Sequence, residues 1–260
     1  MSSNHQTLAL LLDAVLQSWG SQPRLQYCNT ADHPTKSGIG GMLCAAMGIH
    51  KGSPQESEFL QAFSDFRMIT VAVGGQNANT LIDFQVARGG IKSERDDKGG
   101  LVYNKNAVLS HRFYLANQKF GVFLVGPQNW LTKLKSALEN PVWGFWYGRK
   151  CCIPSCPPVI GIFDNTKDAW LEFCKKQPID CSGQHRTIDP SASYPISDDI
   201  NITNQESSFQ NIQMDVPVSF GKQGSSSEGR VKTYRTVYLR NGNLLDCQRD
   251  CPPHQSPCQS

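Results

Sequence analysis

Apolar residues in the first part of the chain follow three different patterns. Residues 7–12 are almost all aliphatic, which is typical of a short strand buried on both faces. Residues 39–47 are mostly apolar, follow Ser and Thr capping candidates and end at Gly48, so they predict a helix. Residues 59–73 alternate roughly between apolar and polar, which predicts a helical turn that leads into a strand.

The middle of the chain predicts three further strands and a helix. Residues 81–88 form one strand, and residues 111–115 and 120–125 form two more, joined by a four-residue turn. Residues 130–138 carry apolar side chains at the spacing of an amphipathic helix, which ends at the Asn-Pro pair 140–141.

The C-terminal part has weaker patterns. Residues 168–176 predict a short helix, and residues 177–213 are rich in Ser, Asp, Asn and Pro, which predicts loop with little regular structure. Residues 215–220 and 231–239 predict two late strands, and no periodicity follows from residue 247 onward. The order of elements favours an α+β fold, a ferredoxin-like unit with an appended C-terminal β part.

Composition narrows the class of protein. Only 18% of residues are charged and the net charge is +3, which excludes a histone-like or tail-type nucleic-acid binder but leaves room for one local basic surface. No apolar run approaches the roughly 18 residues of a membrane-spanning helix. Residues 1–7 are polar and lack the basic start of a secretory signal, so we expect a cytoplasmic protein with reduced cysteines and no membrane partner.

The predicted helix start at residues 34–38 is a candidate anion site. Lys36 and Ser37 lie where free backbone N–H groups favour an anion, and glycines at 38, 40 and 41 allow close backbone approach. The spacing of a nucleoside-triphosphate loop is absent. A capped helix with a glycine-packed interface explains the same residues, so both interpretations stay open.

Two other stretches combine features suited to RNA. Residues 88–105 are basic and glycine-containing, and residues 143–150 combine aromatic and basic side chains. Single-stranded RNA is bound by ring stacking on splayed bases and by cations along the phosphates. A solvated face and a plain core remain the alternatives for each stretch taken separately.

Four ordered matches between residues 8 and 220 resemble CRISPR-associated protein family five, most closely its CasD members in type I-E Cascade. The first match comprises residues 16–20 and 34–43. The second comprises Asp83-Phe84, a charged loop and residues 112–116. The third and fourth are the Gly-Arg-Lys motif at 148–150, after the helix that ends before Pro141, and the strand region 216–220.

The resemblance implies a repeat-associated RNA-binding fold related to the RNA-recognition motif. It also implies a non-catalytic subunit that grips the 5′ handle of the CRISPR RNA, caps the Cascade backbone and projects a β-hairpin thumb over the RNA. Implied partners are the CRISPR RNA, the backbone subunit and the large subunit, with target DNA nearby and no required cofactor. The implied RNA-binding residues are Gln17, Ser18, Trp19, Lys36, Ser37, Arg88, Lys92, Arg95, Lys98, Lys105, His111, Arg112, Arg149 and Lys150.

With this resemblance the chain divides into three parts. Residues 1–140 are expected to form the ferredoxin-like RNA-binding domain, including the thumb at about 88–108. The thumb is also favoured by the charge of this segment, its flanking glycines and its lack of apolar periodicity. Residues 141–245 are expected to form the small β part with long loops, and residues 246–260 a Cys/His tail.

An enzyme is the main alternative, since one type I-C relative in this family is an endoribonuclease that cuts precursor CRISPR RNA. Metal-independent cleavage needs one group to activate the 2′-hydroxyl and another to protonate the leaving oxygen. His111, Tyr27 and Tyr114 are the candidates, with Lys36 beside them. A lone histidine is weak evidence, and the match is to the binding form, so we predict no catalytic residue.

The tail carries four soft ligands, at Cys247, Cys251, His254 and Cys258. Zinc takes four such ligands tetrahedrally and can order a segment that has no core of its own. The alternative is a disordered tail with free thiols. A stand-alone RNA-binding domain with a zinc tail is therefore a third hypothesis for the whole chain.

Overall fold

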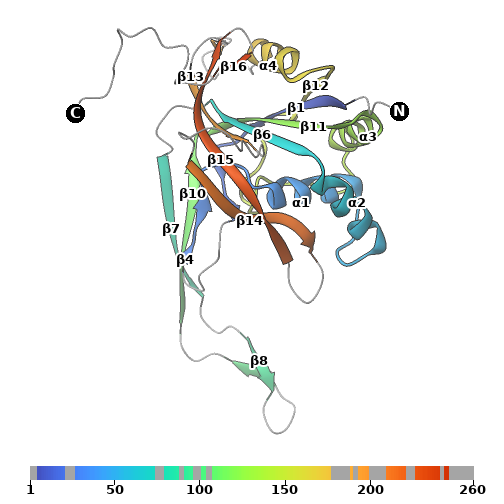
Figure 1. Ribbon diagram of the computed structural model, residues 1–260. Coiled ribbons are helices and arrows are strands. Elements are labelled where there is room, and N and C mark those ends of the chain that lie inside the picture. The colour runs from blue at the N-terminus through green and yellow to red at the C-terminus, as the bar shows by residue number, and fades with distance from the viewer. Residues whose placement is uncertain are drawn as a thin grey trace, which may run out of the picture.

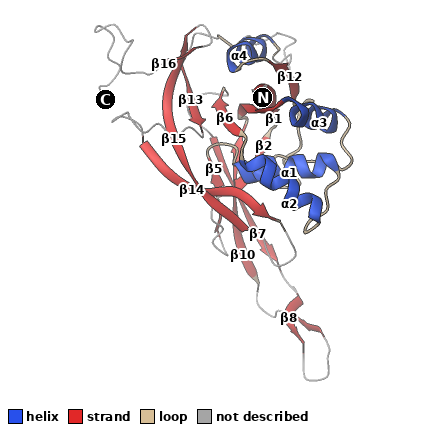
Figure 2. Cartoon of the chain, turned by 45° about the vertical axis from the view of Figure 1, so that its right-hand side comes forward, coloured by secondary structure: helices blue, strands red, loops and turns tan. Residues whose placement is uncertain are grey.

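Across the residues that it describes, the computed structural model shows a mixed α+β fold with four helices and mainly antiparallel sheets (Figure 1), which confirms the α+β prediction. Figure 2 shows the helices in the upper part of the molecule, while β7, β10 and β8 extend downward. The residues described are 5–20, 27–73, 79–87, 91–95, 101–103, 107–176, 188–189, 193–198, 209–220, 226–240 and 243–245.

Among the described residues the main sheet contains eight strands, and its neighbouring strands are paired antiparallel. Its order begins β12 (Val159–Phe163), β1 (His5–Asp13), β11 (Lys119–Pro127), β6 (Arg67–Ala72). It continues β13 (Ser193–Asp198), β15 (Ser226–Arg240), β14 (Phe209–Ser219), and β16 (Asn243–Leu245) pairs with β15.

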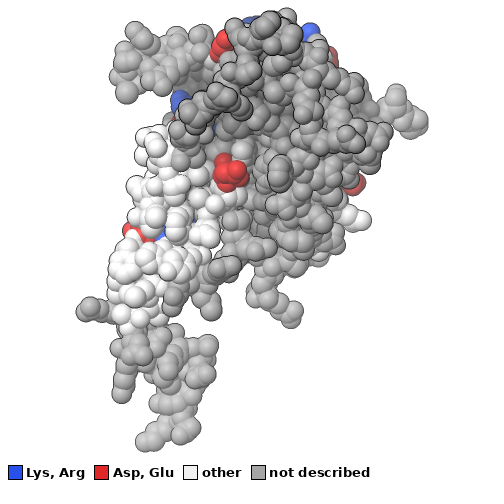
Figure 3. All heavy atoms as spheres, turned by 60° about the vertical axis from the view of Figure 1, so that its left-hand side comes forward, with Lys and Arg blue, Asp and Glu red and all other residues white. Residues whose placement is uncertain are grey.

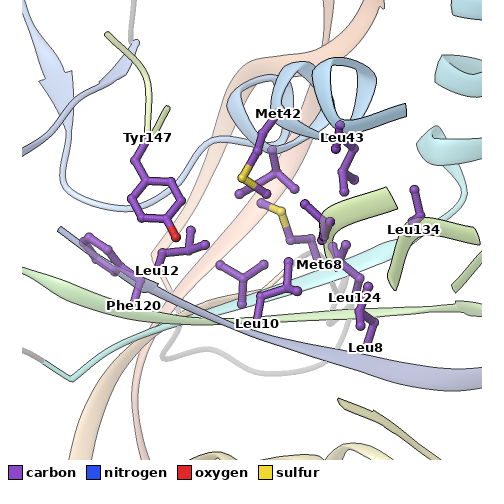
Figure 4. Packing of buried hydrophobic residues seen from close by; sticks show 14 of the residues in the cluster. Leu8, Leu10, Leu12, Met42, Leu43, Met68, Phe120, Leu124, Leu134 and Tyr147 are labelled. Carbon is purple, nitrogen blue, oxygen red and sulfur yellow. The ribbon is translucent and has the colours of Figure 1, made fainter. Parts of the chain in front are cut away.

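Helices cover both faces of β1. Leu8, Leu10 and Leu12 share a core with α1 (Lys36–Met47), α2 (Pro54–Ser64) and α3 (Gln128–Glu139), as Figure 4 shows for part of the cluster. Ala9 and Leu11 pack on the other face against α4 (Thr166–Lys175). Because successive strand residues point to opposite faces, two covered faces require the continuous apolar run seen in the sequence.

Local signals set the ends of the helices. Thr35 caps α1 by accepting a hydrogen bond from the Gly38 N–H, and Gly48 ends the helix at a positive φ of 71°. The helical turn expected near residue 59 is longer and begins at Pro54, because Ser53 caps it and Glu56 lies at the reciprocal position of a capping box.

The predicted boundary at residues 140–141 does not coincide with a break in the main sheet. β12 pairs with β1, and β13 extends the same sheet from the edge of β6. The Arg67 guanidinium on β6 fixes this junction with two hydrogen bonds to the Asp198 carboxylate, at 3.0 and 2.7 Å. β13 lies within the stretch predicted as loop, so backbone pairing with β6 forms a strand that apolar periodicity does not show.

The end of β14 lies against the two helices that precede β6. Gly40 of α1 leaves room for the ring of Pro217, since a Cβ there would lie 3.2 Å from the Pro217 Cγ atom. The buried Glu56 carboxylate accepts hydrogen bonds from the Gly52 and Phe220 N–H groups, at 3.1 and 3.2 Å. The C-terminal strands are therefore part of the core that encloses α1 and α2.

The second sheet is built around β10 (Val108–Ala116). β7 (Asn79–Ala87) pairs with it antiparallel along its whole length, while β2 (Leu16–Gln17) and β4 (Tyr27–Cys28) pair with it antiparallel and parallel respectively. β3 (Trp19–Gly20) follows β2 in the sequence and β5 (Thr30–Ala31) follows β4, and these two strands pair with each other in a small antiparallel ladder.

A hairpin of β8 (Ile91–Arg95) and β9 (Leu101–Tyr103) lies between β7 and β10 in the sequence. Figure 1 shows β8 beyond the far end of β7, away from the main sheet. The backbone thus forms a projecting hairpin within the segment expected at about 88–108. No helix in the described residues combines the length and apolar character needed to cross a bilayer.

Candidate nucleic-acid interface

A cleft of about 560 Å³ lies between the second sheet and the turn at residues 148–151. Its polar lining comes from β7, β10 and this turn, and we call it the cationic cleft. The residues that define it are Asp83, Gln85, Arg112, Tyr114, Arg149 and Lys150. Three cationic side chains from two separate segments therefore meet around one opening.

Arg149 is held in place by the backbone of the second sheet. Its guanidinium donates hydrogen bonds to the carbonyls of Phe113 and Cys28, at 2.8 and 2.7 Å, and lies 4.6 Å from the centre of the Tyr114 ring. Because it joins β10, β4 and the turn, Arg149 fixes the position of the turn in addition to contributing charge.

Gly148 allows the turn to approach the chain near β2. Its φ is +103°, and a Cβ at this position would lie 1.7 Å from the Ser18 carbonyl oxygen. The Ser18 N–H also donates to the Tyr147 carbonyl at 3.0 Å. Only glycine fits this position, so the Gly in the Gly-Arg-Lys motif has a direct structural cause.

Arg112 and Lys150 differ from Arg149, because neither side chain has a hydrogen-bond or ion-pair partner in the part of the chain that the structure describes. Lys150 is exposed and Arg112 is half-buried on β10. Unpaired cations beside an open cleft suit the phosphates of a nucleic acid.

Tyr114 forms a neutral floor of the cleft. Its side chain is buried, and its hydroxyl oxygen lies 3.6 Å from the Cys151 Sγ atom, which donates to it. Burial, and secondarily the Cys151 hydrogen bond, raises the pKa of Tyr114 above its ordinary value. The phenol therefore stays protonated under physiological conditions and adds no negative charge beneath the guanidinium of Arg149.

The other face of the second sheet carries stacked rings, which we call the ring face: Tyr27, Phe84 and His111. The His111 ring stacks on Tyr27 with centroids 5.1 Å apart and an interplanar angle of 8°, and its distance to Phe84 is 5.0 Å. Tyr27 and Phe84 are 48% and 54% exposed. Figure 3, which turns the β7 side forward, shows few charged side chains among the described residues there. Exposed rings of this kind can stack on unpaired bases.

A family model described as CRISPR-associated protein (Cas_Cas5) matches residues 7–231. The chain belongs to the Cas_Cas5 family. This confirms the family resemblance drawn from the sequence motifs.

Solved structures share the fold of this Cas_Cas5 chain. A chain described as "CRISPR RNA-guided surveillance complex" aligns with a TM-score of 0.66 and 22% identity, over 90% of each chain. A second, described as "Crystal structure of Cas protein", aligns with a TM-score of 0.53 and 21% identity, over 92% of this chain and 98% of the other. A comparison with curated proteins gives no match.

Three residues expected to bind RNA near the start of the Cas_Cas5 chain lie inside it instead. Gln17 is fully buried, and its amide donates to the Leu12 and Gln118 carbonyls at 3.0 and 2.8 Å while its oxygen accepts from the Trp19 indole. Trp19 is 1% exposed and packs against Gly38. Ser18 is also buried, so residues 17–19 hold the link between the two sheets and do not form a surface.

The helix start places Lys36 differently from the expected phosphate contact. Its buried ammonium donates to the carbonyls of Ser64 and Phe66, at 2.9 and 2.6 Å, where the partial negative charge of the α2 C-terminus favours a cation. Ser37 is half-buried, with its hydroxyl 3.4 Å from that of Thr35. The glycine-packed interface, which was the alternative for this motif, accounts for these contacts.

The cationic cleft brings together Arg112, Arg149 and Lys150 of the expected set, and His111 lies on the ring face. Sequence reasoning missed Gln85 as a cleft residue and used Asp83 only as part of a motif. The signal that could have identified both is their spacing of two along β7, which places them on one face of the strand.

The remaining candidates lie outside the described residues or side chains. Among the basic thumb residues, Arg88, Lys98 and Lys105 fall outside the described residues, and the side chains of Lys92 and Arg95 are not described. The tail ligands Cys247, Cys251, His254 and Cys258 also fall outside them. Within the described ranges no group of three or more His, Cys, Asp or Glu residues could hold a metal ion.

Proposed function

We propose that this chain is a non-catalytic CRISPR RNA-binding subunit of a type I-E-like Cascade surveillance complex. In this role it grips the 5′ handle of the guide RNA and caps the complex backbone. The observation that carries the proposal is the cationic cleft, in which Arg149 is fixed by backbone carbonyls while Arg112 and Lys150 remain available to phosphate.

The topology of the main sheet supports the finer fold assignment. β1, α1, β6, β11, α3 and β12 follow one another along the chain, with α2 after α1. The strands of the second sheet are inserted at two places, β2 and β4 before α1, and β7 and β10 before β11. Their four strands lie in the order β12-β1-β11-β6. A βαββαβ unit with this antiparallel order is the ferredoxin-like arrangement to which the RNA-recognition motif belongs.

Partners follow from the same proposal. A fold relative is described as a CRISPR RNA-guided surveillance complex, which supports RNA and other complex subunits as partners. We assign the backbone subunit and the large subunit as protein neighbours, with target DNA nearby through the complex. The projecting β8–β9 hairpin is suited to the thumb, because it extends from the strands that carry the cleft.

Geometry also favours binding over catalysis. His111 and Tyr27 lie on the ring face, whereas Tyr114 is three residues further along β10 and is buried beneath the cationic cleft. Lys36 is engaged with the end of α2. The four candidate groups for RNA cleavage therefore do not converge on one reacting position, as general acid–base catalysis requires.

A binding titration at several salt concentrations tests the proposal, with an RNA of CRISPR-repeat sequence as the probe. Arg112→Ala and Lys150→Ala should each weaken binding and reduce the slope of log K against log salt by about 0.7, the value for one phosphate contact on a single strand. Lys167→Ala, an exposed lysine on α4, is the matched control and should change neither. Unchanged slopes in both cleft variants would contradict the assignment.

A cleavage assay separates the proposed role from the enzyme alternative. Wild-type protein and the His111→Ala variant are incubated with the same repeat RNA in EDTA. We expect intact RNA in both reactions. Site-specific cutting by the wild type that the variant lacks would establish the endoribonuclease instead, since a positioned acid–base group contributes about 10² to 10⁴ in rate.

A further inference from the structure

One carboxylate lies within the cationic cleft. Asp83 on β7 is directly opposite Arg112 on β10, and it shares the cleft with Arg149 and Lys150. Among the described residues, no cation forms an ion pair with Asp83. Its partner is Gln85, whose amide Nε2 donates to the Asp83 Oδ2 atom at 2.6 Å. Both side chains are half-buried.

A carboxylate at this position opposes the binding of phosphate. Like charges repel, and the repulsion grows where solvent is partly excluded. A carboxylate has only acceptor atoms, and the Gln85 amide, which uses one of its two N–H donors on Asp83, adds its Oε1 atom as another acceptor. The pair is therefore favourable in an RNA-binding cleft when it meets hydrogen-bond donors on a base.

The four bases differ in the hydrogen-bond donors and acceptors that they can offer to Asp83. Guanine presents two adjacent donors on its Watson–Crick edge, N1–H and the N2 amino group. Adenine, cytosine and uracil each place an acceptor beside their donor, and that acceptor would face a carboxylate oxygen. Splayed bases of single-stranded RNA are read on this edge. The volume of about 560 Å³ lies in the range of small-ligand sites, and Leu81 and Ile82 add apolar lining.

We propose that Asp83, oriented by Gln85, is a specificity-determining residue that selects guanine at one position of the bound RNA. This inference rests on the proposed RNA-binding function and adds to it the base that the cleft reads. Arg112 and Lys150 then contribute sequence-independent affinity, while Asp83 discriminates among sequences.

The test uses the full chain and a pool of random eight-nucleotide RNAs, with the bound fraction sequenced. Wild-type protein should enrich guanine roughly tenfold at one position, because a good bidentate contact discriminates by about 1–3 kcal/mol. The isosteric variant Asp83→Asn should lose that enrichment, because the amide replaces one of the two acceptor atoms with a donor. Lys150→Ala, the matched control, should bind all sequences more weakly and keep the guanine preference.

A second measurement uses one enriched RNA and its copy with inosine in place of the guanine. Inosine lacks the N2 amino group, so wild-type binding should fall about tenfold and Asp83→Asn binding should stay the same. Thermal melting of each variant establishes that it is folded.

Two results would overturn the inference, and they are distinguishable. RNA binding without base preference, or with the same preference in Asp83→Asn, removes the guanine-reading role and leaves the proposed function intact. Absence of RNA binding by the folded wild-type chain removes the proposed function and the inference with it.

Discussion

The two sheets of this molecule differ in how far their strands are buried by other parts of the chain. In β1 of the main sheet, all residues from 7 to 12 are buried, because α1, α2 and α3 cover one face and α4 covers the other. In β10 of the second sheet, Leu109 is 45% exposed and only Tyr114 and Leu115 are buried. A strand covered on both faces has no side chain left for a ligand, and the candidate binding residues of the cleft lie on the second sheet and the turn beside it.

The contrast also separates two kinds of cation. The ammonium group of Lys36 is buried and bound to carbonyls at the end of α2. Arg112 lies on the second sheet and Lys150 on the adjoining turn, where both line the cleft. Arg149 lies between these cases, since it both packs and lines the cleft. Whether a cation is available to a ligand therefore depends on where it lies in the fold, and not on the number of positive charges in the chain.

The largest expected difference in stability is between two leucine-to-alanine substitutions, one in each sheet. Leu10→Ala in β1 should lower the free energy of unfolding by about 2–5 kcal/mol, because it removes a fully buried side chain and leaves a cavity. Leu109→Ala in β10 should cost less than about 1 kcal/mol, since that side chain is already partly in water. Denaturant unfolding measures both, and equal losses would remove the distinction between the sheets.

Substitutions of Arg149 and Lys150, which are neighbours in the cleft, should differ by a smaller amount in the free energy of unfolding. Arg149→Ala should lower the free energy of unfolding by about 1–3 kcal/mol, because two backbone carbonyls lose a charged donor. Arg149→Lys should restore little of this, since one ammonium cannot reproduce the two-armed contact and the stacking on Tyr114.

Lys150→Ala is the control for this pair and should change stability by no more than about 0.5 kcal/mol. Thermal melting distinguishes the two positions. If Lys150→Ala destabilises the protein as much as Arg149→Ala, the division between a structural and a ligand-facing cation in the cleft is wrong.

A pH dependence of stability is expected from α1, a helix that covers one face of β1. Burial, with a lesser contribution from the Glu56 carboxylate, raises the pKa of Cys44 on α1 from 9.0 to about 12. The unfolded chain releases this proton above pH 9 and the folded chain retains it. The corresponding part of the stability is thus complete below pH 9 and is lost as the pH rises toward 12.

Cys44→Ala should therefore flatten the decline in unfolding free energy between pH 9 and 11, measured by denaturant titration. Leu109→Ala changes an exposed side chain that does not titrate and should leave the shape of the profile as in the wild type. Identical profiles for the wild type and both variants would show that Cys44 does not titrate with unfolding.

Sequence patterns predicted those parts of the fold that depend on local residues. The apolar run at 7–12 and the helix that ends at Gly48 are both present, because their burial and capping are encoded within about ten residues. β13 was missed, because its strand conformation depends on pairing with β6, more than 100 residues earlier in the chain. Local periodicity carries no information about such a partner.

The candidate site was predictable to a similar extent. The motif that contains Arg149 and Lys150 and the strand that contains Arg112 were both identified, and the fold brings them to one cleft. Lys36 was expected at the surface, because a helix start in isolation is an anion site. The sequence does not place the end of α2 beside that start, and this tertiary contact turns the side chain inward.

The position of β1 between β11 and β12 has a consequence for synthesis on the ribosome. This strand is synthesised well before its two partners, which extend to residues 127 and 163. A nascent chain therefore carries an apolar strand with two open edges until β11 follows and one open edge until β12 follows, and such edges invite pairing with other chains. We therefore expect any chaperone dependence during expression to be relieved once residue 163 has left the exit tunnel.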